Sequence, residues 1–175
     1  MRSLKIYIYI LALGVLLFYQ SVDAAQEYYL IKVSFSRIKL FLYDESGKEV
    51  AVFPVTLSRI TPKKFPVEGE VNEIIRKPSW GPSEGTRREY LRKYRKELAK
   101  FIKYGDPDNA MGEAKIIIVF KTEDVNPIIR IHGTNKEEFI GQRVSRGCIR
   151  MRNKDILSLL DIVNEKNKIK VLFTE

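Results

Sequence analysis

The chain contains one histidine and one cysteine, His132 and Cys148, and both lie in the segment Ile131–Met151. Gly133 follows the histidine and Gly147 precedes the cysteine. A free cysteine has a pKa of about 8.5 and is mostly protonated at neutral pH, whereas the thiolate is the attacking species. A neighbouring imidazole can accept that proton and later return it to a leaving amine. The pair therefore predicts a cysteine nucleophile, Cys148, with His132 as general base and acid.

His132 and Cys148 could also have structural or metal-binding roles. Exported proteins usually pair their cysteines as disulfides, which Cys148 cannot do within the chain. It is then a reactive thiol, an intermolecular partner or a small buried apolar residue. His132 taken alone is more often structural, but the shared glycine-flanked segment favours catalysis. One histidine and one cysteine fall short of the usual three or four zinc ligands, so neither a metal nor another cofactor is predicted.

The residues around Cys148 indicate how a substrate could be held. The backbone N–H groups of Gly147 and Cys148 are candidate donors to the oxyanion of a tetrahedral intermediate. Arg150 lies two positions beyond the cysteine, so an extended backbone would place both side chains on one face. Arg150 then either binds a substrate carboxylate or forms a structural ion pair.

The surroundings of His132 leave its orienting partner open. The histidine follows the apolar segment 128–131 and precedes a glycine, which predicts a place at the end of a strand. A backbone carbonyl or a hydroxyl could orient its imidazole, and Thr134 and Ser145 are the candidate hydroxyls.

Most of the chain has the pattern of strands. The first three segments are rich in aromatic and β-branched residues and are separated by short turns, which predicts an antiparallel meander. The predicted strands cover residues 28–35, 38–43, 49–56, 67–76, 115–120, 128–131 and 168–173.

Two helices are also predicted. The first covers residues 86–104 and carries a strongly basic face, which is either solvated or part of a lid that attracts an acidic polymer. The second begins with Asn153 as N-cap and Asp155 in its first turn. Together the elements predict a mainly β domain with one packed helix and one helical excursion.

The first residues predict export. Arg2 and Lys5 precede an apolar run that ends at Tyr19, and small or apolar residues lead up to Ala24. This predicts a signal peptide at residues 1–24 and one domain at 25–175, with no membrane span once the signal is removed; an uncleaved anchor is the alternative. The formal charge of +9 favours anionic partners, although no nucleic-acid-binding motif is present.

The segment from His132 to Met151 resembles the signature of the L,D-transpeptidase catalytic domain, the YkuD-like family. The resembling pieces are His132-Gly133-Thr134, Ile140-Gly141 and Ser145-Arg146-Gly147-Cys148-Ile149-Arg150-Met151. The opening strands, a tryptophan-proline segment at Trp80 and the closing helix and strand are similar as well. The resemblance implies a β-sandwich of mixed sheets with the YkuD-like fold.

In that family the cysteine attacks the peptidoglycan stem peptide before its terminal D-alanine. D-Alanine leaves, and an amine of a second stem resolves the thioester and forms a cross-link between third residues. The resemblance implies that Cys148 is the nucleophile, His132 the base and acid, and Gly147 an oxyanion donor. The implied substrate-binding residues are Ser145, Arg146, Arg150, Gly133, Thr134 and Trp80. Peptidoglycan stems are the implied partners, and the implied location is the periplasm or the cell wall.

One residue departs from the family pattern. Arg146 stands where the family usually has histidine before the Gly-Cys pair. A fixed cation there would favour the thiolate but could not shuttle a proton. Four alternatives remain: an L,D-carboxypeptidase, attachment of an envelope lipoprotein to the wall, a non-catalytic wall-binding protein and an unrelated exported cysteine protease.

Overall fold

The computed structural model describes residues 27–175, so the predicted signal peptide lies outside the described residues. The strands are β1 (Tyr28–Ser34), β2 (Lys39–Tyr43), β3 (Glu49–Pro54), β4 (Leu57–Ser58), β5 (Val67–Arg76), β6 (Ala114–Phe120), β7 (Ile128–His132), β8 (Arg143–Ser145), β9 (Ile149–Arg150) and β10 (Lys168–Thr174). The helices are α2 (Glu84–Tyr94), the short 3₁₀ helix η1 (Glu137–Phe139) and α3 (Asn153–Ile162). No helix among residues 27–175 is both long and apolar enough to cross a bilayer.

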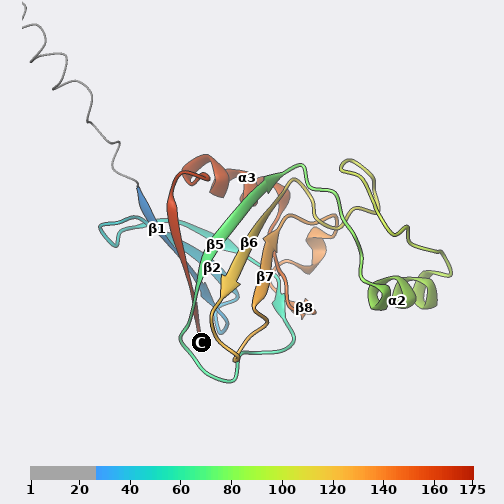
Figure 1. The fold of residues 1–175 in the computed structure, drawn as a ribbon, viewed down its shortest axis with the longest axis horizontal. Coiled ribbons are helices and arrows are strands. Elements are labelled where there is room, and N and C mark those ends of the chain that lie inside the picture. Colours follow the sequence, from blue (N-terminus) through green and yellow to red (C-terminus); the bar gives the residue numbers. More distant parts are fainter. Residues whose placement is uncertain (1–26) are drawn as a thin grey trace, which may run out of the picture.

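Within residues 27–175, eight strands form one curled mixed sheet in the order β3-β2-β1-β10-β5-β6-β7-β9, and β4 pairs with β8 (Figure 1). The first three strands form the predicted antiparallel meander. The last strand, β10, runs parallel to β1 and antiparallel to β5. The mainly β fold class predicted from the sequence is confirmed.

Alternating burial along the strands explains why these segments form a sheet around one core. In β6 every second residue is buried, beginning with Ala114 and ending with Phe120, and β10 follows the same period. Each fully buried aliphatic or aromatic side chain contributes about 1.5–3 kcal/mol relative to exposure. Helix α3 adds buried side chains to this core: Ile156, Leu159 and Leu160.

The prediction of a helix over residues 86–104 is wrong in its second half. Helix α2 begins at Glu84, after the N-cap Ser83, whose Oγ accepts from the N–H of Thr86 at 3.2 Å. It ends at Tyr94 because Arg95 takes a left-handed conformation with φ of 55°. Beyond it, Ile102 exchanges two backbone hydrogen bonds of 2.8 Å with Trp80, which a continuous helix would not permit.

The predicted N-cap of α3 is also corrected. Arg152 occupies the cap position, and Asn153 is the first helical residue. The backbone N–H of Asn153 donates to Glu137 Oε1 at 3.1 Å, which places a carboxylate at the helix N-terminus. The Asn153 side chain is directed away from its own helix and binds other backbone groups.

Three very short strands were not predicted, and two of them flank Cys148. Strand β8 ends three residues before the cysteine, and β9 begins directly after it. Strand β9 is held on both edges, by parallel pairing with β7 and by two backbone hydrogen bonds between Thr56 and Arg150. Such short strands lack a periodic signal in the sequence because only their neighbours define them.

Candidate active site

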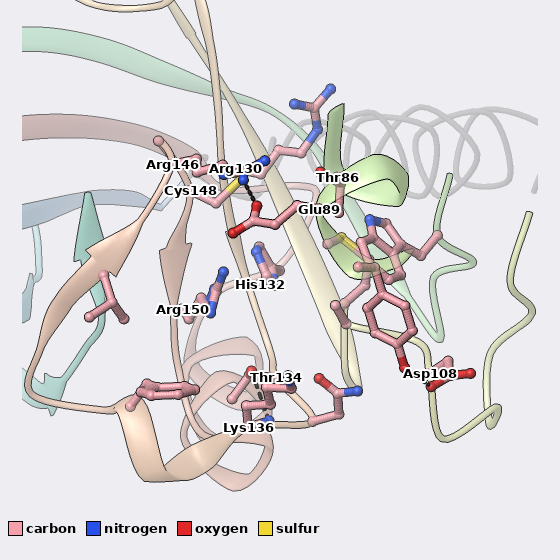
Figure 2. A pocket seen from close by; sticks show the side chains of 18 of the residues that line it. Thr86, Glu89, Asp108, Arg130, His132, Thr134, Lys136, Arg146, Cys148 and Arg150 are labelled. Atoms are coloured by element: carbon pink, nitrogen blue, oxygen red, sulfur yellow. Dashed lines mark hydrogen bonds and ion pairs between the residues drawn. The ribbon is translucent and has the colours of Figure 1, made fainter. Parts of the chain in front are cut away.

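A cavity of about 780 Å³ opens beside β7 and β9, and α2 borders it. Cys148 and His132 both line this cavity. Figure 2 shows their side chains in the same cavity, together with Arg150 and Glu89. The cysteine is half-buried rather than sealed in the core. The thiol and the imidazole predicted from the sequence are therefore brought into one site.

The pairing of β7 with β9 brings these groups together. The two strands run in parallel with His132 opposite Arg150, and the Met151 N–H donates to the His132 carbonyl at 2.9 Å. Ile149 is buried in the core, whereas Cys148 and Arg150 on either side of it face the cavity. The alternation predicted for Cys148 and Arg150 is confirmed.

A backbone carbonyl orients the His132 imidazole. Nδ1 lies 2.6 Å from the Gly133 carbonyl oxygen. Since a carbonyl can only accept, this short contact assigns the proton to Nδ1 and leaves Nε2 as the basic nitrogen. The hydroxyl alternatives fall to other uses: Thr134 Oγ1 accepts from the N–H of Lys136, and Ser145 binds within the cysteine turn.

Burial dominates the pKa of His132. Only 2% of the residue is exposed, and desolvation lowers its pKa to about 4. The cations Arg150 and Arg130 act in the same direction, whereas hydrogen bonds to the Gly133 and Ala110 carbonyls oppose it. The imidazole is consequently neutral at neutral pH and available to accept a proton.

Burial likewise raises the pKa of the Cys148 thiol. The charges of Arg130 and Arg150 and a backbone hydrogen bond with Arg130 partly oppose this effect. The predicted cation Arg146 is not one of the groups acting on the thiol. A neutral thiol and a neutral imidazole thus line the same cavity. Neutral groups suit proton transfer during attack rather than a preformed ion pair.

The turn before Cys148 corrects the substrate-binding role expected for Ser145. Ser145 is 1% exposed and does not line the cavity. Its hydroxyl donates to the Cys148 carbonyl and accepts from the Gly147 N–H at 3.3 Å. Ser145 therefore braces the turn and engages the Gly147 amide that was expected to hold the oxyanion. The Cys148 N–H makes no hydrogen bond with residues 27–175 and is the freer donor.

Gly147 has a conformational role in this turn. Its φ is +145°, a value that side chains of L-residues rarely allow, although an added Cβ would meet no atom within 4 Å. Glycine is therefore favoured at this position by the backbone conformation, and not by a lack of space for a side chain.

Arg130 was missed in the sequence. It lines the cavity, and its charge acts on both the thiol and the imidazole. A signal was available, because Arg130 lies two residues before His132 in the same strand, and alternation places both on one face.

Arg146 forms an ion pair with Glu89 of α2, which sequence analysis did not single out (Figure 2). Both residues line the cavity, so the pair links α2 to the turn that carries Cys148. No local pattern reveals it, because 57 positions separate the two residues in the printed sequence.

The other predicted residues divide into two groups. Trp80 and Thr134 line the cavity, as expected for substrate-binding residues, whereas Gly133 does not line it and provides its carbonyl to His132. Among residues 27–175, no group of three or more histidine, cysteine, aspartate or glutamate side chains could hold a metal ion.

Comparisons with known proteins identify the family of this chain. A family model described as the L,D-transpeptidase catalytic domain matches residues 28–171. The probable L,D-transpeptidase ErfK/SrfK of Escherichia coli (strain K12) is 36% identical over 148 residues, which is 81% of this chain and 43% of the relative. The probable L,D-transpeptidase YbiS of the same strain is 31% identical over 135 residues, or 76% of this chain and 41% of the relative. The chain spans less than half the length of these curated relatives.

A solved structure gives the fold likeness. L,D-transpeptidase 3 from Mycobacterium tuberculosis, in complex with a faropenem-derived adduct, aligns with a TM-score of 0.54. The sequences are 16% identical, and the match covers 85% of this chain and 61% of that one. At this identity the likeness concerns the fold alone.

Proposed function

The chain belongs to the L,D-transpeptidase catalytic domain family, and on that premise we propose that it is an L,D-transpeptidase acting on peptidoglycan stem peptides. The observation that carries the proposal is the placement of Cys148 and His132 in one cavity, with Nδ1 of the imidazole bound to the Gly133 carbonyl.

The proposed reaction begins with the neutral thiol. His132 Nε2 takes the Sγ proton as the sulfur attacks the carbonyl that precedes the terminal D-alanine of the donor stem. The Cys148 N–H stabilises the resulting oxyanion. The imidazolium returns the proton to the D-alanine amine, the C–N bond breaks, and a thioester remains on the sulfur.

An acceptor amine completes the cycle. The amine of a second stem attacks the thioester, His132 removes its proton, and the thiol is regenerated with a new amide bond formed. Arg130 and Arg150 flank the sulfur from β7 and β9, and their charges suit the carboxylates of a stem peptide. Thr134 and Trp80 line the cavity and complete the proposed substrate-binding set.

The purified protein incubated with disaccharide-tetrapeptide muropeptides tests this function by mass spectrometry. Dimers that have lost one D-alanine support transpeptidation. Tripeptides alone would show that water is the acceptor and that the enzyme is an L,D-carboxypeptidase. No product from the wild-type protein would favour a non-catalytic wall-binding role.

The Cys148→Ala variant is the matched control. It is expected to form no product and to unfold at nearly the wild-type temperature, because one half-buried sulfur is removed. Retention of activity in this variant would refute the assignment of the nucleophile.

A carbapenem is expected to add covalently to the wild-type protein and not to Cys148→Ala, which intact-mass measurement detects.

We also propose that the protein is exported to the periplasm or the cell wall, where its substrate lies. The basic start, apolar run and small residues of positions 1–24 support this. The protein recovered from the envelope is expected to begin at Ala25, which N-terminal sequencing measures.

A further inference from the structure

Asn153, at the start of α3, makes three side-chain hydrogen bonds next to the active site. Its Oδ1 accepts from the N–H groups of Thr134 and Glu113, each at 3.1 Å. Its Nδ2 donates to the Thr134 carbonyl at 3.0 Å. One amide thus joins the first turn of α3, the start of β6 and the turn that follows His132.

The Gly133–Thr134 peptide connects Asn153 to the imidazole. The N–H of Thr134, which binds Asn153, and the carbonyl of Gly133, which binds His132 Nδ1, belong to the same planar peptide unit. In a trans peptide these two groups point in opposite directions. Holding the N–H on one side therefore aims the carbonyl at the imidazole on the other side. Hydrogen bonds linked in this way also polarise one another.

Packing leaves this peptide little freedom. A Cβ added at Gly133 or at Gly112 would collide with Asn153 Oδ1. Gly112 also has a φ of +64°, which favours glycine. Two backbone turns therefore close on the Asn153 amide, and both glycines are needed for that approach. Gly133 and Thr134 are themselves buried. If the hydrogen bonds of Asn153 to Thr134 were removed, water would therefore be poorly placed to replace them.

We infer that Asn153 is a positioning residue for His132: it fixes the Gly133–Thr134 peptide, and through that peptide the Nδ1–H tautomer and the orientation of the imidazole. The catalytic consequence rests on the proposed function, because it concerns the base of that reaction. The inference about the tautomer does not rest on the proposed function, because the tautomer is a property of the resting protein.

The single histidine makes the tautomer directly measurable. Nitrogen-15 NMR of the uniformly labelled protein has only one imidazole to report, so no assignment is needed. The wild-type ring is expected to give the signals of one Nδ1–H tautomer at pH 7. Asn153→Ala is expected to give a mixture of the two tautomers, and its kcat is expected to fall on the order of 10- to 100-fold with a smaller change in KM.

A second variant separates positioning from folding. Asn153→Asp keeps an oxygen acceptor for the Thr134 and Glu113 N–H groups. Its second carboxyl oxygen replaces Nδ2 beside the Thr134 carbonyl, which favours the protonated acid there, because only the acid can donate to that carbonyl. This variant is expected to retain the Nδ1–H tautomer and most of kcat, even if Asn153→Ala does not fold. Loss of the tautomer in a folded Asn153→Asp protein would overturn the inference.

Asn109 offers a matched control for stability. It is a buried asparagine with three hydrogen bonds to other backbone groups, those of Pro78, Lys103 and Met111. Asn109 also holds the turn around Ala110, whose carbonyl is the second one bonded to His132. Asn109→Ala is expected to lower the unfolding temperature as Asn153→Ala does, yet to keep the single tautomer, because the Gly133 carbonyl stays fixed. A mixture of tautomers in Asn109→Ala as well would show that loss of stability, and not the contact of Asn153, changes the tautomer.

Two outcomes remain distinguishable. A folded Asn153→Ala protein with one Nδ1–H tautomer and wild-type kcat would show that Asn153 only stabilises the fold, and would overturn the inference. If wild-type protein forms no product from muropeptides, the proposed function fails, and the NMR result still decides whether Asn153 sets the tautomer.

Discussion

At the scale of single residues, the proposed chemistry depends on two neutral groups, His132 and Cys148, whose pKa values burial has moved in opposite directions. Desolvation lowers the pKa of His132 and raises that of Cys148. A thiolate–imidazolium pair is thereby disfavoured in the resting site, and in the proposed reaction both charges form only as the substrate is attacked. The cations Arg130 and Arg150 lower both pKa values. They therefore make the thiolate easier to form and the imidazolium harder to form.

The pKa of His132 predicts a pH dependence of stability. Unfolding returns the imidazole to an ordinary pKa of 6.5, whereas the folded value is about 4. Between these values the unfolded chain binds more protons, so the stabilisation from this group is complete above pH 6.5 and is lost as the pH falls toward 4. The difference amounts to roughly 3 kcal/mol.

Urea denaturation of wild type and His132→Gln from pH 4 to pH 7.5 measures this contribution. The free energies of unfolding of the two proteins are expected to diverge with rising pH up to about 6.5, with wild type gaining more. Parallel curves through that interval would contradict the assigned pKa.

The pKa of Cys148 predicts slow alkylation at neutral pH. The rate with iodoacetamide is expected to rise with pH, with a midpoint above that of an ordinary cysteine, because burial opposes the thiolate. Arg130→Gln and Arg150→Gln are each expected to move the midpoint higher still, since each removes a cation that favours the thiolate. Arg92→Gln, an exposed change on α2, is the control and is expected to leave the midpoint unchanged. A midpoint below the ordinary value would contradict the burial argument.

At the scale of elements, α2 differs from α3 because none of its residues is buried, whereas α3 buries Ile156, Leu159 and Leu160. Polar contacts hold it beside the cavity. Glu89 pairs with Arg146, Tyr90 donates to Asp108 Oδ1 at 2.9 Å, and Tyr94 accepts from Lys136 at 3.1 Å. Figure 1 shows α2 set apart from the sheet, in contrast to α3, which packs on it. Because α2 buries no side chain, we expect it to separate from the sheet at a lower cost in free energy than α3.

The basic face predicted for residues 86–104 is solvated, and only Arg88 and Arg92 of it belong to α2. The basic residues predicted for the excursion are exposed, and none of them lines the cavity: Arg88, Arg92, Arg95, Lys96, Lys100 and Lys103. The cavity side instead carries Thr86, Glu89, Tyr90, Lys93 and Tyr94.

The Glu89–Arg146 pair is expected to limit access to Cys148. The two side chains are 44% and 61% exposed, so the pair contributes at most about 1 kcal/mol. Glu89→Gln is therefore expected to increase the rate of labelling by a bulky maleimide up to about fivefold. The rate with the small reagent iodoacetamide is expected to change less, and the ratio of the two rates separates access from thiol reactivity.

Glu84 supplies the matched control for this experiment. It is on the same helix and pairs with Arg88 at 3.8 Å, away from the cavity. Glu84→Gln is expected to leave the ratio of labelling rates at the wild-type value. An equal change in both variants would show that helix stability, rather than the contact with Arg146, governs access.

At the scale of the whole molecule, the excess of positive charge extends into the cavity. Six cationic side chains line it: Arg59, Lys93, Arg130, Lys136, Arg146 and Arg150. Only Glu89 and Asp108 oppose them among the lining residues. A cavity with this balance raises the local concentration of anionic substrates and accelerates their arrival.

The charge of the cavity predicts a salt-dependent KM. For a muropeptide substrate, KM is expected to rise several-fold as the ionic strength increases from 0.05 to 0.5 M, while kcat changes little, because salt screens binding more than the buried chemistry. Arg150→Gln is expected to reduce that dependence. A KM independent of salt would exclude electrostatic binding as the role of these cations.

The sequence by itself identified the candidate pair His132 and Cys148, the long strands and the family. His132 and Cys148 are unique residues in a glycine-flanked segment, and strands such as β5 follow from a local alternation that needs no knowledge of distant partners. The length of α2 was overestimated, since helical periodicity continues past Arg95 while the backbone there turns to pair with Trp80.

Only the tertiary structure decided how the pair is supported. The Gly133 carbonyl at His132, the cation Arg130 at the thiol and the Glu89–Arg146 contact depend on the register between segments that are distant in the chain or on side-chain direction. Asn153 shows the same limit: its type and position favoured a helix cap, but a free backbone N–H and carbonyl across the fold bound its amide instead. Local propensity ranks the roles a residue can take, and the groups that folding brings within hydrogen-bond distance select one of them.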